Sequence, residues 1–407
     1  MSETVGVLEL EDAILRVLGC VPAPEKETLA LANAAGRILA TPAVALIDLP
    51  LFDNSAVDGY AVRAEDISAA RTDSPAELML LGRTAAGERF EGTVTGGTCV
   101  RVFTGSPMPA GADAVVMQED TQIDAGAPGK VWVFDSVKPQ ENVRLQGEDV
   151  RRGKVVADKG EPLTPARIAL LGAAGVASIE VGRQPRVAVL ATGSELKQPG
   201  EALSGGQIYE SNRLALAALI TLAGGHARLF PVVPDEPAAT EAALRAAFEE
   251  CDVVVTCGGV SVGEMDFVRA AFERLGGMLE FRKVSMRPGR PAAFGRLGGK
   301  LLFGLPGNPV SAFVTFLMLV RPAILRWQGA ANLAMPTIPG KLAEPVMNPG
   351  SCRHFVRVFV DGAGTVREAG PQASHLLGSL AAANGLVDVP AGARLAAGSA
   401  VAVLRLD

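Results

Sequence analysis

The first stretch of the chain has the spacing of an amphipathic helix. Across residues 8–18, apolar side chains recur at helical intervals on one face: Leu10, Ala13, Ile14, Val17 and Leu18. Acidic residues occupy the first turn, where they complement the helix dipole. The pattern predicts a helix here, and we predict a second helix from Glu27 to about Leu39.

Between about residues 76 and 137 the apolar positions come in short runs instead. The runs LMLLG, CVRVF, AVVMQ and KVWVF are separated by Gly, Pro and Asp, which is typical of strands joined by turns. Residues 138–182 return to mixed character, with a helix predicted around Pro165–Gly172. We therefore predict a discontinuous N-terminal domain, residues 1–48 and 138–182, with an inserted β domain, residues 49–137.

Strands and helices alternate between residues 183 and 330. The runs RVAVLATG, ARLFPVV, DVVVTC and LLFGL indicate buried strands. Helices are predicted between and after them, over Ser211–Leu222, about 235–249, Asp266–Leu275 and Ser311–Trp327. This alternation predicts a three-layer α/β domain whose parallel sheet is covered by helices on both faces. After about residue 331 a β pattern returns, so residues 331–407 are predicted to form a C-terminal β domain and the fold class is multidomain α/β.

Composition narrows the class of protein. A net charge of −6 and only 5% aromatic residues argue against a nucleic-acid binder. The five cysteines have no C-x-x-C spacing, which favours free thiols in a reducing compartment. The N-terminus lacks the basic start of a signal peptide, and the apolar run Val310–Val320 is too short to cross a bilayer. We therefore expect a soluble, cytoplasmic protein without nucleic-acid or membrane partners.

Candidate chemistry lies where the predicted parallel strands end, because ligands bind at that edge of an open sheet. Three loops follow such strands: ATGSEL (191–196), TCGGVSVGEMD (256–266) and GLPGNP (304–309). Small residues let backbone N–H groups approach a phosphate closely, and those we expect to bind substrate are Ser194, Gly258, Gly259 and Ser261.

A basic segment lies between the last two of these loops. FRKVSMRPGRP concentrates four cations on an acidic protein: Arg282, Lys283, Arg287 and Arg290. Together with the loops, it predicts a site for a phosphorylated or oxyanionic ligand. Glu195, Asp235 and Asp266 are available there to hold Mg²⁺.

Two other motifs overlap the Gly-rich loop. A phosphate-binding P-loop is excluded, because Glu264 stands where its lysine should be. Gly259, Ser261 and Gly263 fit the G-x-S-x-G elbow of a serine hydrolase. Its histidine would have to be His354 or His375, which both lie beyond the α/β region, and no oxyanion segment precedes the serine. The hydrolase interpretation is therefore disfavoured.

Several motifs appear in one order along most of the chain: FDNSAVDGYAVR (52–63), RVFTGSPMPAGADAVVMQED (101–120), ENVRLQGEDV (141–150), ATGSEL, PVVPDE (231–236), CGGVSVGEMDF (257–267), RPGRPAAFG (287–295), GLPGNPVS (304–311) and PQASHLLGSLAAANGL (371–386). In this order they resemble the MoeA family, which includes the E domain of gephyrin. The resemblance implies an elongated homodimer with four domains per subunit: a discontinuous mixed domain, an inserted β domain, a three-layer α/β domain and a β-barrel-like C-terminal domain.

The resemblance also implies an activity, molybdenum-cofactor biosynthesis. The family transfers molybdenum from molybdate to adenylylated molybdopterin, with Mg²⁺-dependent release of AMP. The adenylyltransferase that makes this substrate is a further implied partner. The implied catalytic positions are Asp58, Thr104, Asp149, Glu195, Asp235 and Asp266, with Glu195 and Asp266 as metal ligands. The implied substrate-binding positions are Arg144, Lys283, Arg287, Pro306, Pro309 and Ser374.

Some of these residues also have purely structural interpretations. Asp58 could close a turn, Asp235 could cap a helix, and Arg144 could form an ion pair with Asp149. Pro306 and Pro309 could only shape their loop. Two departures from the family pattern matter as well. Arg287 and Arg290 stand where the family often has lysine, and SCRHFVRV (351–358) matches its pattern loosely, so we assign no role to His354.

Two alternative functions remain, a molybdopterin adenylyltransferase and a gephyrin-like scaffold. The N-terminal half with DNSAVDGYA argues against the first, since such an adenylyltransferase needs only the α/β region. The acids Glu195, Asp235 and Asp266 argue against a purely structural role. We also expect the active site to be shared between subunits, mainly because the resemblance implies an elongated dimer with a cleft between its subunits. Asp58 and Thr104 lie in or beside the inserted β region, whereas Glu195, Asp266 and Lys283 belong to the α/β region.

Overall fold

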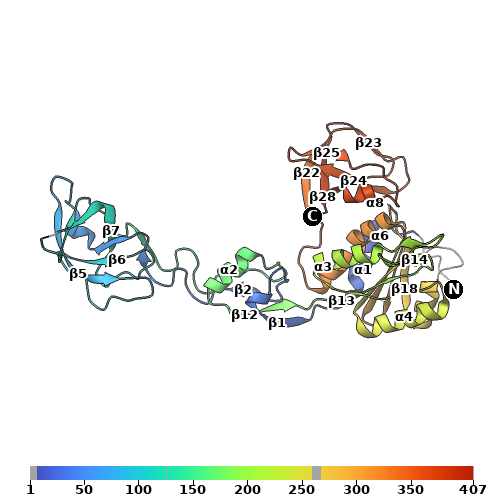
Figure 1. Ribbon diagram of the computed structural model, residues 1–407, viewed down its shortest axis with the longest axis horizontal. Coiled ribbons are helices and arrows are strands. Elements are labelled where there is room, and N and C mark those ends of the chain that lie inside the picture. Colours follow the sequence, from blue (N-terminus) through green and yellow to red (C-terminus); the bar gives the residue numbers. More distant parts are fainter. Residues whose placement is uncertain (1–6, 125, 259–266, 407) are drawn as a thin grey trace.

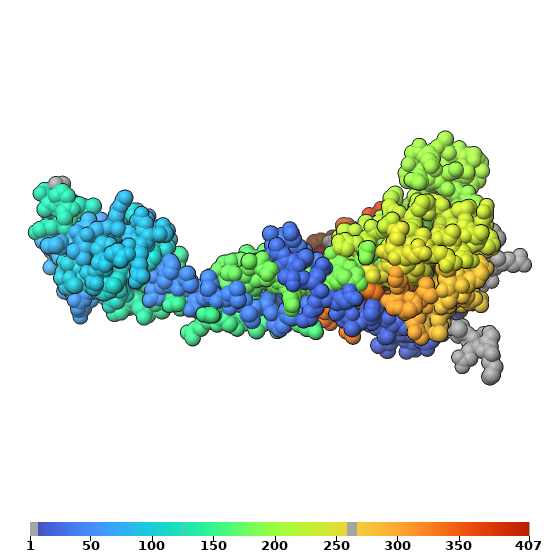
Figure 2. All heavy atoms as spheres, turned by 90° about the horizontal axis from the view of Figure 1, so that it is seen from below, coloured from blue at the N-terminus to red at the C-terminus, as the bar shows by residue number. Residues whose placement is uncertain are grey.

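The computed structural model describes residues 7–124, 126–258 and 267–406. The molecule is elongated (Figure 1), with the inserted β domain at one end and the α/β and C-terminal domains at the other. The N-terminal domain lies between the two ends and forms the narrow middle of the molecule (Figure 2). The predicted fold class is confirmed, and it places two groups of candidate site residues far apart in one chain.

The N-terminal domain is built on paired strands. β1 (Lys26–Ala30) pairs antiparallel with β12 (Ser178–Gly182), and β2 (Ala43–Val44) with β11 (Val155–Ala157). The 3-10 helix η1 (Leu31–Asn33) and α2 (Pro165–Ala173) complete it. The helix predicted from Glu27 is therefore wrong, whereas the helix at Pro165 is confirmed. β1 alternates between exposed and half-buried residues, and its pairing with a strand remote in sequence overrides the local helical tendency.

The first helix belongs with a different part of the molecule than we expected. α1 (Leu10–Cys20) buries Leu10, Ala13 and Val17 in the core of the α/β domain rather than in the N-terminal domain. Its amphipathic face was recognisable from the sequence, but the surface that the face covers was not.

The inserted β domain is a mixed sheet with the order β7-β4-β6-β5-β9-β8. Only β5 and β6 pair in parallel. Its strands are β4 (Gly59–Val62), β5 (Ala76–Thr84), β6 (Thr98–Val102), β7 (Ala114–Met117), β8 (Thr121–Ile123) and β9 (Lys130–Val133), with the 3-10 helices η2 (Ala64–Ile67) and η3 (Gln118–Asp120). β3 (Asn54–Ser55) and β10 (Val143–Arg144) pair where the chain enters and leaves this domain.

The α/β domain contains the four predicted strands and two further ones. Its strands are β16 (His226–Leu229), β13 (Arg186–Ala191), β17 (Val253–Cys257), β21 (Lys300–Leu305), β20 (Pro291–Leu297) and β18 (Met278–Lys283), in this spatial order. β16, β13, β17 and β21 are parallel, as predicted. β20 runs antiparallel to β21, because a tight turn at Gly298 and Gly299 joins the two strands, and β18 pairs antiparallel with β20.

Helices cover both faces of this sheet. Along β13, Val187 and Val189 face one core and Ala188 and Leu190 face the other, as strand alternation requires. The first core includes α1, α3 (Asn212–Leu222), α6 (Pro309–Thr315), the π-helical turn η4 (Phe316–Val320) and α7 (Arg321–Trp327); the second includes α4 (Pro237–Glu250) and α5 (Phe267–Arg274).

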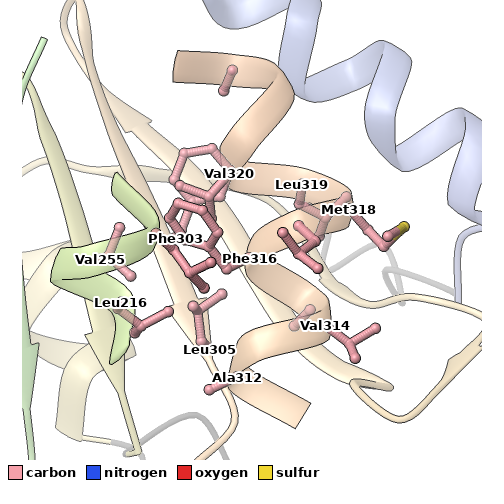
Figure 3. Packing of buried hydrophobic residues seen from close by; sticks show 14 of the residues in the cluster. Leu216, Val255, Phe303, Leu305, Ala312, Val314, Phe316, Met318, Leu319 and Val320 are labelled. Atoms are coloured by element: carbon pink, nitrogen blue, oxygen red, sulfur yellow. The ribbon is translucent and has the colours of Figure 1, made fainter. Parts of the chain in front are cut away.

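The segment Pro309–Trp327 is the central helix of the first core. Phe316 lies beside the strand residues Phe303 and Leu305 (Figure 3), and Leu319 and Val320 belong to the same buried cluster. Among the described residues, it is also the one helix long and apolar enough to cross a membrane. However, 78% of its apolar window is buried inside the molecule, so it serves as a core helix.

The C-terminal domain is a closed barrel. Its strands pair in the order β24-β25-β22-β28-β26, and β26 returns to β24. These strands are β22 (Thr337–Leu342), β24 (Arg353–Val360), β25 (Thr365–Glu368), β26 (Gly385–Val389) and β28 (Ala400–Arg405). β23 (Val346–Met347) pairs with β27 (Arg394–Leu395), and α8 (Leu377–Ala381) faces α6. β19 (Met286–Arg287) lies between β18 and β20 in the sequence, but it pairs in parallel with β24 of the C-terminal domain.

Candidate active site

The three loops predicted to bind a ligand meet at one edge of the α/β sheet. They follow β13, β17 and β21, which are adjacent and parallel. The Thr192 N–H donates to Cys257 O at 3.1 Å, and the Gly258 N–H donates to Leu305 O at 3.2 Å. A Cβ on Gly258 would lie 2.8 Å from Thr192 O, so glycine permits this close approach. The described parts of these loops therefore form one continuous surface.

Glu195 and Asp235 lie on this surface in different settings. The Ser194 N–H donates to Asp235 Oδ2 at 3.0 Å, and the Asp235 N–H donates to Ser194 Oγ at 3.2 Å. Asp235 therefore ties two loops together, and it does not cap α4, which begins after Glu236. The Glu195 carboxylate folds over Gly193, where a Cβ would lie 2.6 Å from Oε2. Glu195 is exposed and has no side-chain partner among the described residues, so its carboxylate is available to a ligand.

The predicted basic segment divides between two domains. Lys283 ends β18 and pairs in register with Pro291, which places it at the edge where β21 ends. Arg287 lies on β19 and pairs in register with His354 of the C-terminal barrel. Gly289, which follows Arg287 and Pro288, has a φ of +108°, and a Cβ there would lie 2.3 Å from Thr315 Oγ1. Glycine thus allows the basic segment to pack directly on α6.

The C-terminal domain also reaches the PGNP loop. Ser374 O accepts from the Val310 N–H at 3.1 Å, and Asn308 Nδ2 donates to Ser374 Oγ at 3.2 Å. Pro309 is the first residue of α6, where its missing N–H costs no helical hydrogen bond. Pro306 is buried at the end of β21. The structure therefore brings Pro306, Pro309 and Ser374 together at the boundary between the domains.

Arg357 is a candidate functional residue that the sequence analysis missed. Its side chain is fully buried, and it donates from Nε to Ser379 Oγ at 3.0 Å and from Nη2 to Pro371 O at 2.7 Å. Nη1 is buried with no partner in the described structure. Burial lowers the pKa of the guanidinium. A cation inside the apolar run FVRVFV was the available signal, since arginine is rarely fully buried without a partner.

His354 is buried near the same cations. Burial, with Arg287 and Arg357 nearby, lowers the pKa of the imidazole to about 4, so the ring is neutral at pH 7. Its Nε2 has no hydrogen-bond partner in the described structure. The region around Arg287, Arg357 and His354 is therefore short of negative charge.

In the β domain, Asp58 and Thr104 form a close pair. Asp58 Oδ1 accepts from the Thr104 N–H at 2.8 Å and from Thr104 Oγ1 at 2.9 Å. These two hydrogen bonds hold the pKa of Asp58 below its ordinary value, and the bond from the Thr104 N–H has the larger effect. Both residues are exposed, so this carboxylate remains ionised and accessible.

Thr104→Val should raise the pKa of Asp58 part of the way toward its ordinary value. The hydroxyl bond is lost, but the larger effect of the Thr104 N–H remains. The pKa of Asp58 is lower in the folded state than in the unfolded state, so the pair stabilises the fold at pH values above the unfolded-state pKa. This stabilisation is lost as the pH falls through the folded-state pKa. A carboxyl NMR titration of both proteins measures the change, and identical Asp58 titration curves would show that the hydroxyl has no such effect.

Arg144 and Asp149 lie where the β domain rejoins the N-terminal domain. Arg144 pairs in register with Asn54, and the Asp149 N–H donates to Leu49 O at 3.1 Å. Both side chains are exposed, and no ion pair joins these two described residues. The structural interpretation of Arg144 and Asp149 as an ion pair is therefore wrong.

The candidate residues thus form two groups. Glu195, Ser194, Asp235, Gly258 and Lys283 surround the sheet edge, with Arg287, Pro306, Pro309 and Ser374 at the adjoining domain boundary. Asp58 and Thr104 lie in the β domain at the far end of the same chain (Figure 1). Gly259, Ser261 and Asp266, as well as Gly263 of the hydrolase motif, lie outside the described residues.

A cluster of three metal-binding side chains is not formed within residues 7–124, 126–258 and 267–406. The expected ligand Asp266 is not among them. Mg²⁺ often takes only one or two carboxylates and fills its other positions with water and substrate phosphates. The exposed, unpartnered carboxylate of Glu195 suits this mode of binding.

Fold and site define an elongated, multidomain α/β protein in which three loops meet at the edge where its parallel strands end. Family models match nearly the whole chain: the MoeA N-terminal region (domain I and II) over residues 8–175, a probable molybdopterin binding domain over residues 188–326, and the MoeA C-terminal region (domain IV) over residues 339–406. The chain therefore belongs to the MoeA family.

Curated relatives and solved structures agree with this assignment. The molybdopterin molybdenumtransferase of Haemophilus influenzae is 39% identical over 386 residues, 93% of each chain. Molybdopterin molybdenumtransferase 2 of Mycobacterium tuberculosis is 40% identical over 369 residues, 89% of this chain and 90% of the relative. The molybdopterin biosynthesis MoeA protein from Pyrococcus horikoshii, whose crystal structure is solved, is 32% identical in sequence. Its structure superposes with a TM-score of 0.84, and the match covers 99% of this chain and 100% of the Pyrococcus chain.

Proposed function

We propose that this enzyme transfers molybdenum from molybdate to adenylylated molybdopterin and releases AMP, as a step of molybdenum-cofactor biosynthesis in the cytoplasm. The observation that carries the proposal is the meeting of three loops at one sheet edge, with Glu195 exposed and Lys283 beside them. Backbone N–H groups and a lysine suit the phosphates of an adenylylated substrate.

The domain boundary next to this edge suits molybdate, a small dianion. We assign Arg287, Arg357 and Ser374 to its binding. Arg357 Nη1 is a buried donor without a partner in the described structure, and Arg357 Nη2 also donates to Ala373 O, next to Ser374, at 3.2 Å. An anion at this boundary would satisfy the unpaired donor and offset the local positive charge.

Mg²⁺ is the cofactor we propose for the phosphate side of the site. Glu195 would hold it together with Asp266, whose position lies outside the described residues. When bound, Mg²⁺ neutralises charge that develops on the phosphates. Asp235 keeps the Glu195 loop in place through Ser194, and Lys283 contributes a further positive charge.

The site is proposed to be shared by the two subunits of a homodimer. Asp58 and Thr104 are separated from Glu195 by the whole N-terminal domain (Figure 1), so one chain does not bring them together. A two-fold dimer can place the β domain of one subunit against the α/β edge of the other, forming two equivalent sites.

The two alternative functions make different predictions. An adenylyltransferase would use ATP and metal-free molybdopterin, and it would not need Asp58 in a second domain. We regard such an enzyme as the supplier of the substrate and as a transient partner. A pure scaffold would show no turnover, and it would not require an accessible carboxylate at Glu195.

The proposal is tested by incubating the purified protein with Mg²⁺, molybdate and adenylylated molybdopterin. We expect AMP and metallated pterin to form together, and both to require all three additions. Release of AMP without metal insertion, or no turnover of an intact substrate, would contradict the proposal. Adenylylation of metal-free molybdopterin by ATP would favour the adenylyltransferase alternative.

A further inference from the structure

A short corner of the chain, Glu210–Arg213, connects β15 (Ile208–Tyr209) to α3 and lies beneath the site loops. β15 pairs in parallel with β14 (Leu196–Lys197), which directly follows Glu195. The Ile208 N–H donates to Glu195 O at 2.9 Å, and the Glu210 N–H donates to Lys197 O at 2.8 Å. The corner is thus attached by its backbone to the loop that carries Glu195.

The corner contains a buried ion pair. Glu210 is 3% exposed and Arg213 is 7% exposed. Glu210 Oε1 accepts from the Arg213 N–H at 2.8 Å, and Oε2 accepts from Arg213 Nε at 2.9 Å. The Glu210 carboxylate therefore accepts hydrogen bonds both from a backbone N–H in the first turn of α3 and from the guanidinium of Arg213. Such a pair has a single geometry, because moving either partner leaves a buried charge unpaired.

The same corner reaches two further loops by side-chain hydrogen bonds. Arg213 Nη1 donates to Phe230 O, at the start of the segment that leads to Asp235. Asn212 Nδ2 donates to Gly307 O at 2.7 Å, between Pro306 and Pro309. Loops that follow three different strands are therefore tied to one rigid point.

We propose that Glu210, Asn212 and Arg213 are positioning residues, which set the Glu195 loop, the Asp235 loop and the PGNP loop at fixed distances from one another. This inference rests on the proposed function, since it assigns the three residues a role in that reaction. None of them has to touch the substrate. They act by preorganising groups that do, and misplacing such groups by about 1 Å can cost about a hundredfold in rate.

Asn212→Asp is the sharpest test, because it keeps the size of the side chain, removes the donor to Gly307 O and places a negative charge beside that oxygen. Arg213→Lys keeps the charge but cannot hold Glu210 and Phe230 O at once. The matched controls are Asn332→Asp, whose exposed side chain only accepts a bond from the Ala334 N–H, and Arg245→Lys in an exposed pair with Glu241.

Two readouts separate positioning from simple stability. Amide hydrogen exchange of the ligand-free protein reports loop order without any turnover. We expect faster exchange over residues 304–308 in Asn212→Asp and over 193–197 in Arg213→Lys, with no change in the controls. In the AMP-release assay both variants should lose about ten- to hundredfold in kcat with a smaller change in KM.

Wild-type kcat in both folded variants would overturn the proposal, even if exchange rises. Unchanged exchange would overturn it as well, because the loops would then not depend on the corner. If the wild-type protein itself releases no AMP, the proposed function fails. The exchange data still decide whether the corner orders the loops.

Discussion

Replacing Glu195 by glutamine is expected to lower kcat for AMP release by about a hundredfold or more, the usual effect of losing one preorganised electrostatic group. Glutamine keeps the shape of the side chain but cannot supply the negative charge that we assign to Mg²⁺ binding. Because Glu195 is exposed and unpartnered among the described residues, the free energy of unfolding should change by less than about 0.5 kcal/mol. Asp266→Asn should behave in the same way.

The control for this result is Glu201→Gln in the same part of the chain. Glu201 accepts a bond from the Gln198 N–H at 2.9 Å, and a glutamine can still accept it. We expect wild-type kcat for this variant, and thermal melts should be alike for all the proteins. If Glu195→Gln turns over at the wild-type rate, Glu195 has no part in the reaction.

Arg357→Met is expected to have the largest effect on stability. Three acceptors lose their donor, namely Ser379 Oγ, Pro371 O and Ala373 O. Of these, only Ser379 Oγ is buried, and a buried acceptor left unpaired costs about 1–3 kcal/mol, so the free energy of unfolding should fall by about that amount. Urea unfolding measures the loss, and Arg357→Lys should show a smaller one because it retains a donor.

The same two variants test the proposed molybdate site. A ligand that binds only the folded state raises the melting temperature, so molybdate should stabilise the wild-type protein. It should stabilise Arg357→Met much less, and sulfate at equal ionic strength serves as the control for salt effects. An undiminished molybdate shift in Arg357→Met would remove Arg357 from the oxyanion site.

The elements predicted well from the sequence are those with strong local patterns. The parallel strands β13, β17 and β21 are short apolar runs followed by small residues, and their order predicts that the following loops meet. β1 was missed because its strand conformation depends on β12, which lies about 150 residues further along the chain. The strands β20 and β18 were missed; β20 opposes β21 because the turn at Gly298 reverses the direction of the chain, and β18 pairs antiparallel with β20.

The candidate site residues also divide into those that local sequence patterns predict and those that depend on distant segments. Glu195 and Lys283 could be predicted, because they lie within a few residues of strand ends on one sheet. Arg287 belongs to the same basic segment as Lys283, but in the structure it pairs in register with His354 and so lies on the C-terminal barrel. Arg357 could not be assigned, since its partners Pro371 and Ser379 come from segments that only the closed barrel brings to it.

Each active site is proposed to combine the β domain of one subunit with the α/β edge of the other. Asp58→Asn and Glu195→Gln homodimers should each be inactive. In a mixed dimer, one site collects both substitutions and the other is intact. The two proteins are co-expressed with different tags, so that the subunits exchange during folding and mass spectrometry can verify the mixed dimers.

Random one-to-one mixing should restore about a quarter of wild-type AMP release, because about half of the two-fold dimers are mixed and each has one intact site. Purified mixed dimers should reach about half of the wild-type activity by the same reasoning. If verified mixed dimers stay as inactive as their parents, Asp58 and Glu195 do not complement each other across subunits, and the shared site is contradicted.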